Sequence, residues 1–263
     1  MVYQWLGFGC NIVQIAALVV ICARTYRRLD RREKYLPTIL FLFGMVALML
    51  SELYWLVHGL IRPDFRFPYS SSEISQDGGL LLLAAALVAL LGRSREKMLA
   101  VTVGAVCFTL INIALWILWS GEWFKDIFDG IFFTYYVVVV ARSIKRTGGL
   151  YKREWKCLVL VGAALMAGET LWSFVPEQTQ IMADVFNYSV IIAVFLFFLV
   201  KIIISLRRGD APVRSLCLAY GGFTWSLFSM YMSADPYYLV PFVGSTVMMV
   251  LMHVAMEREV VRA

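Results

Sequence analysis

Long apolar stretches alternate along the whole chain with short segments that carry the basic residues, and this alternation constrains the fold most strongly. A membrane-spanning helix needs roughly 17–25 mostly apolar residues. Because 61% of the residues are hydrophobic and the mean hydropathy is +0.75, we interpret the apolar stretches as membrane spans rather than as a soluble core. The sequence predicts nine spans, at about 3–23, 36–56, 75–92, 98–119, 124–141, 157–175, 181–204, 215–232 and 237–256.

The distribution of basic residues predicts the orientation of these spans. Of the 24 Lys and Arg residues, 21 lie in the linkers after the first, third, fifth and seventh spans or in the C-terminal tail. Segments rich in Lys and Arg stay on the cytoplasmic side of a membrane. We therefore expect the N-terminus outside and the C-terminus in the cytoplasm. The basic residues on the opposite side are Arg62, Arg66 and Lys125.

The predicted fold class is an all-α, polytopic integral membrane helix bundle in which residues 1–263 form a single transmembrane domain. The sequence also predicts an internal repeat, with one copy at 36–142 and the other at 157–258. In each copy a glutamate is followed three residues later by a tryptophan, Glu52 and Trp55 in the first and Glu169 and Trp172 in the second. Each half holds an even number of spans, so the halves would be parallel 4+4 repeats after the first helix. Chance similarity between apolar helices is the alternative.

The composition excludes several classes of protein. The spans and their short linkers leave no room for a separate catalytic or nucleic-acid-binding domain, so the pI of about 9.1 reflects anchoring charge beside anionic lipid rather than nucleic-acid binding. The five cysteines lie in or at the ends of apolar stretches without a CxxC pair and predict packing roles. We expect no cofactor, no metal ligands and no catalytic residues. We expect the protein to be located in the bacterial cytoplasmic membrane.

The acidic residues are distributed oppositely to the basic ones, with 11 of 18 at or toward the predicted outer face. Many precede or open the outward-facing N-termini of spans, among them Glu73, Asp77 and Asp129. A carboxylate there satisfies unpaired backbone N–H groups and suits the helix dipole. Capping or solvation is therefore the first interpretation of each of these acids taken alone.

Glu52 and Glu169 lack that explanation, because they lie near the C-terminal ends of the second and sixth spans, where the helix dipole opposes a negative charge. Each has a Trp on the same helix face three residues later. An ionisable side chain within a span is costly and is a candidate for function, although both could instead reach the headgroup region. The predicted ligand-binding residues are Glu52, Trp55, Glu169, Trp172, Glu73, Asp77, Asp129 and Asn187.

Acidic and aromatic side chains together suit a cationic or zwitterionic ligand. The leading hypothesis is a small-solute membrane transporter or permease subunit with an outward-facing site. One alternative is a membrane ligand sensor or accessory subunit that signals through a separate cytoplasmic partner protein, and a third is an intramembrane enzyme. The expected partners are the lipid bilayer, a small-molecule ligand, and a second copy of the chain or the cytoplasmic partner, without nucleic acid.

Overall fold

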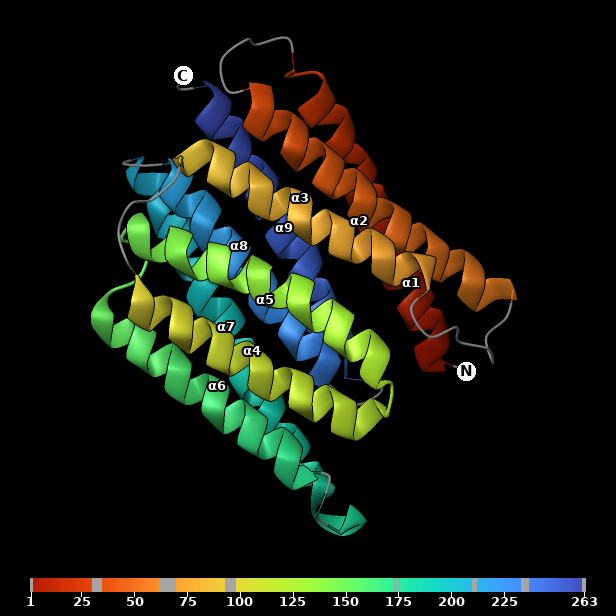
Figure 1. Cartoon of the computed structure of the whole chain (residues 1–263). Coiled ribbons are helices and arrows are strands. Elements are labelled where there is room, and N and C mark those ends of the chain that lie inside the picture. The colour runs from red at the N-terminus through yellow and green to blue at the C-terminus, as the bar shows by residue number, and fades with distance from the viewer. Residues whose placement is uncertain are drawn as a thin grey trace.

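A computed structural model describes residues 2–29, 35–61, 70–92, 98–172, 174, 176–209, 212–232 and 237–261. Within these ranges the chain forms nine α-helices and no strand (Figure 1). The helices are α1 Val2–Tyr26, α2 Tyr35–Ile61, α3 Ser71–Leu91, α4 Leu99–Ser120, α5 Trp123–Arg146, α6 Lys152–Trp172, α7 Glu177–Arg208, α8 Pro212–Met232 and α9 Leu239–Val261.

Eight of the described helices, all except α8, are long and apolar enough to cross a membrane. This confirms the predicted polytopic membrane helix bundle, and the protein is an integral multi-pass membrane protein. Each predicted span corresponds to one described helix, although the helices extend beyond several of the predicted boundaries. The largest extension is in α7, which covers 32 residues.

The helix α8 has a different environment from the other eight. It packs against α5, α7 and α9, and 16 of its 21 residues are buried. The hydroxyls of Thr224, Ser226 and Ser229 each donate a hydrogen bond to the backbone carbonyl four residues earlier. These three hydroxyls are thus satisfied within the helix, and because protein rather than lipid surrounds α8, it needs less hydropathy than a lipid-facing span.

Close helix approach around α8 depends on two glycines. A Cβ atom added to Gly221 would lie 2.6 Å from Ile144, and one added to Gly222 would lie 2.6 Å from Met248. Small residues let helix backbones pack closely in lipid. Glycine therefore occupies the positions on α8 at which side chains of α5 and α9 pack closely against it.

The other helices pack largely on their neighbours in sequence. The helix α2 packs on α1 and α3, α4 packs on α5, and α6 packs on α7. In Figure 1, α1, α2 and α3 lie on one flank of the bundle and α4, α6 and α7 lie toward the opposite flank. The matching pairs α2/α3 and α6/α7 are each in contact, as are α4/α5 and α8/α9, and the internal repeat stays a prediction.

Candidate functional site

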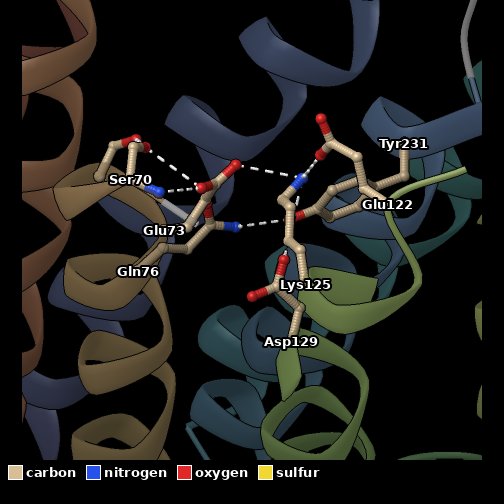
Figure 2. Close-up of polar contacts among 8 residues, drawn as sticks. Ser70, Glu73, Gln76, Glu122, Lys125, Asp129 and Tyr231 are labelled. Atoms are coloured by element: carbon tan, nitrogen blue, oxygen red, sulfur yellow. Dashed lines mark hydrogen bonds and ion pairs between the residues drawn. The ribbon is translucent and has the colours of Figure 1, made fainter. Parts of the chain in front are cut away.

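A group of charged side chains lies where the first turns of α3 and α5 meet, at the end of the bundle that we call the acidic end. On α3, Glu73 and Asp77 are four residues apart, and on α5 Lys125 and Asp129 have the same spacing. Residues at this spacing share one helix face, and α3 packs directly on α5. Figure 2 shows that the Glu73 and Lys125 side chains point toward one another. We define the Lys125 cluster as Glu73, Asp77, Glu122, Lys125, Asp126 and Asp129.

Lys125 has several carboxylates around its ammonium group. Its Nζ lies 3.1 Å from Glu73 Oε1, 3.9 Å from Glu122 Oε2 and 4.0 Å from Asp129 Oδ2. Only 6% of Lys125 is exposed, so water does not solvate this charge. A buried ammonium is tolerated only when nearby carboxylates compensate for its desolvation, and the contact with Glu73 also joins α5 to α3.

Glu73 is fixed in place by the start of its own helix. The backbone N–H of Ser70 donates to Glu73 Oε2 at 2.5 Å, and the Ser70 hydroxyl donates to the same oxygen at 3.1 Å (Figure 2). This is a capping box, in which the first turn of the helix satisfies its own backbone donors. Glu73 Oε1 is therefore free of the cap and available to Lys125.

The cluster contains more acid than base. Five of its six members are acids and one is a base, and three of the five carboxylates lie within 4.0 Å of the Lys125 ammonium. Asp77, Asp126 and Asp129 are all buried, and Asp129 interacts electrostatically with its charged neighbours on α3 and α5. Buried carboxylates are costly unless protons or cations accompany them. Lys125 is one such cation.

Asp129 points to where a further cation would bind. The Asp129 side chain is 8% exposed, and its Oδ1 has no hydrogen-bond partner. A buried carboxylate oxygen normally accepts a hydrogen bond, so this oxygen has an open acceptor position beside Lys125. Among the described residues, no group of three or more His, Cys, Asp and Glu could hold a metal ion.

Aromatic side chains border the cluster from α4 and α8. Gln76 Nε2 donates to the hydroxyl of Tyr231 at 3.5 Å (Figure 2). The Tyr231 ring is 4.6 Å, centroid to centroid, from Trp116, whose indole N–H has no hydrogen-bond partner. Aromatic faces attract organic ammonium groups through cation–π contact. Carboxylates and aromatic rings therefore stand close together at the acidic end, in the combination that the sequence predicted for a cationic ligand.

Glu52 and Glu169 lie elsewhere and have separate partners. Asn11 Nδ2 on α1 donates to Glu52 Oε2 at 2.7 Å, and Asn187 Nδ2 on α7 donates to Glu169 Oε1 at 2.6 Å. Because α2 and α6 lie on opposite flanks of the bundle (Figure 1), the structure does not bring the two glutamates into one pocket. We call these contacts the two Glu–Asn pairs.

The predicted tryptophans differ in exposure. Trp55 is 59% exposed on the surface of α2, which is typical of an anchor at a membrane interface. Trp172 is partly buried and its indole N–H has no hydrogen-bond partner. The eight predicted ligand-binding residues are thus distributed over three places, with Glu73, Asp77 and Asp129 in the Lys125 cluster and the rest near one of the two Glu–Asn pairs.

Sequence reasoning missed Lys125, Glu122, Asp126, Gln76 and Tyr231 as members of a site. A signal for Lys125 was present, because it is one of three basic residues outside the basic linkers and has acids three residues before and four residues after it. Comparison with protein-family models, with curated proteins and with solved structures finds no match for this chain. The functional argument therefore rests on the geometry of these residues.

Proposed function

We propose that the protein is a small-solute transporter or permease subunit of the bacterial cytoplasmic membrane, and that it receives cationic or zwitterionic solutes at the Lys125 cluster. The observation that carries this proposal is the buried group of ionisable side chains around Lys125, with the open Oδ1 of Asp129, at helices long and apolar enough to span a membrane. Ionisable groups inside spans are costly and mark pathways for substrates, ions and protons.

The contacts suggest how a solute would enter. Lys125 already lies within 4.0 Å of both Glu73 and Glu122, and its four-carbon side chain is flexible. An arriving ammonium group can replace Lys125 at Asp129, because the open Oδ1 of Asp129 accepts its hydrogen bond. For a zwitterion, the Lys125 ammonium would pair with the carboxylate of the solute.

The orientation of the chain supports the same direction of approach. The basic linkers predict that the acidic end faces outward. A field of negative charge at that end attracts cations and repels anions. The Lys125 cluster would therefore serve as the outer, solute-collecting part of the pathway.

Reconstituted proteoliposomes test the proposal. Currents on a solid-supported membrane should follow addition of organic amines or amino acids, and should be absent with organic acids. Asp129→Asn should remove most of the current, whereas Glu154→Gln, at the opposite end of the bundle, should retain it. Solute binding without any current would support the sensor alternative instead, and neither binding nor current with any amine would contradict the proposal.

A further inference from the structure

One face of α7 lines a cavity with apolar residues first and with both basic residues in its C-terminal half. Cavity-lining residues recur along it at intervals of three and four, which places them on a single helix face. The first four members along the chain are apolar, the basic members Lys201 and Arg208 lie in the second half, and all of them border one cavity of about 440 Å³. From α7 the lining residues are Ala193, Leu196, Phe197, Val200, Lys201, Ile204, Ser205 and Arg208.

The two walls of this cavity come from the neighbouring chain segments. Tyr151, immediately before α6, borders it on one side, and Arg214 in the first turn of α8 borders it on the other. The hydroxyl of Ser215 donates to Ser205 Oγ at 2.7 Å and ties α8 to α7 beside the cavity. We call the cavity the α7 groove. Its basic end coincides with the predicted cytoplasmic end of the bundle.

The charges at the basic end of the groove differ in how they are paired. Lys201 forms an ion pair with Glu154 and its Nζ lies 4.8 Å from the centroid of the Tyr151 ring. In contrast, Arg214 Nε is buried and has no hydrogen-bond partner. A buried guanidinium N–H without an acceptor is unfavourable, and an anionic oxygen would satisfy it.

The apolar part of the groove restricts what kind of anion fits. From Ala193 to Arg208, α7 rises about 22 Å at roughly 1.5 Å per residue. One leaflet provides about half of a hydrocarbon thickness of roughly 30 Å, so the groove is long enough for an acyl chain below a headgroup. Leu196 and Val200 are exposed along this face, and a soluble anion would leave them uncovered.

We propose that the α7 groove binds one anionic phospholipid of the inner leaflet. Its phosphate would accept hydrogen bonds from Arg208 and Arg214, and one acyl chain would lie along Val200, Leu196 and Ala193. Basic pockets between spans at the cytoplasmic side suit acidic headgroups. This site is separate from the Lys125 cluster and does not depend on the proposed function.

Detergent-purified protein, delipidated and then titrated with phosphatidylglycerol, tests this proposal by native mass spectrometry. The double variant Arg208→Gln/Arg214→Gln should bind phosphatidylglycerol roughly tenfold more weakly than the unchanged protein, since each basic group near an anionic lipid contributes to its affinity. Arg207→Gln is the matched control, because Arg207 is exposed and does not line the groove. It should bind as the unchanged protein does.

A second variant keeps the test informative if the double variant does not fold. Ala193→Phe fills the apolar part of the groove and leaves every basic residue in place, and it should also lower phosphatidylglycerol binding several-fold. Phosphatidylcholine should bind weakly to all variants. The proposal is overturned if both altered proteins bind phosphatidylglycerol normally, if phosphatidylcholine binds equally well, or if millimolar inorganic phosphate displaces the lipid fully.

Discussion

The two Glu–Asn pairs and the Lys125 cluster both place carboxylates inside spanning helices, but they balance those carboxylates differently. In each pair, one glutamate accepts one hydrogen bond from an amide on the sequence-adjacent helix. In the cluster, three carboxylates, from Glu73, Glu122 and Asp129, lie within 4.0 Å of a single ammonium. A carboxylate that accepts from an amide on the neighbouring helix is a helix–helix contact, whereas several carboxylates gathered around one ammonium suit the binding of a cation.

The largest effect is expected on removing the central charge. Lys125→Met keeps the length of the side chain but leaves the buried carboxylates without their cation, and breaking a buried ion pair costs about 3–5 kcal/mol. Thermal unfolding in detergent should show a much lower melting temperature. The double variant Lys125→Met/Glu73→Gln should recover part of that loss. An unchanged melting temperature for Lys125→Met would show that the cluster does not need its ammonium.

The second effect separates binding from stability. Asp129→Asn keeps the shape of the side chain and leaves the shorter Lys125–Glu73 pair in place, so the fold should be retained, but the variant loses a charged acceptor for the solute. Hydrogen bonds to charged groups contribute about 1.5–3 kcal/mol, and uptake of a transported amine at low concentration should fall roughly tenfold or more. Proteoliposome uptake measures this. Normal uptake by a folded Asp129→Asn protein would move the solute site away from the cluster.

Variants of the Glu–Asn pairs should lose stability and keep uptake, which is the opposite of the result expected for Asp129→Asn. Asn187→Leu leaves Glu169 without its donor at the α6/α7 contact. Loss of a hydrogen bond to a charged group costs about 1.5–3 kcal/mol, so the melting temperature should fall moderately while uptake by the remaining folded protein is unchanged. Asn11→Leu at the α1/α2 contact is the parallel variant. Loss of uptake without loss of stability would contradict the interpretation of the pairs as helix contacts.

The smallest effects are expected for Glu52→Gln and Glu169→Gln. A glutamine carbonyl still accepts the hydrogen bond from Asn11 or Asn187, and polar contacts between spans average about 0.6 kcal/mol. Both variants should therefore keep near-normal stability and uptake. The sequence-based hypothesis, in which both glutamates bind the ligand, instead predicts weaker binding in each variant, so uptake at limiting solute concentration distinguishes the two accounts.

The architecture was predictable because apolar length and basic linkers are properties of each segment by itself. The α8 span was predicted despite its serines and glycines, and only the structure shows that α8 is the central buried helix. The partners of the acids could not be predicted. Glu73 and Asp129 had a sufficient local explanation as residues near helix starts, and no sequence pattern states that α3 packs against α5 rather than against another helix.

Lys125 illustrates the same limit. Its spacing to Glu122 and Asp129 lies within one helix and is visible in the sequence, whereas its shortest ion pair, to Glu73, joins residues 52 positions apart. The Glu–Asn pairs join neighbouring helices. Asn187 was predicted only as a polar residue within a span, and Asn11 was not predicted. Local sequence patterns identified the acidic residues as candidates. Only the packing of α3 on α5 shows that Glu73 and Asp129 both lie beside Lys125.

Thiol labelling at Gln76 tests the central claim most directly, because Gln76 lies beside the cluster and contacts Tyr231. Gln76→Cys, in a background without the five native cysteines, would be treated from outside intact cells with cationic and anionic methanethiosulfonate reagents. The account predicts roughly tenfold faster labelling by the cationic reagent, and a smaller ratio when Asp129→Asn is added. Equal rates, faster labelling by the anionic reagent, or labelling only from the cytoplasmic side would contradict an outward-facing cation site at the Lys125 cluster.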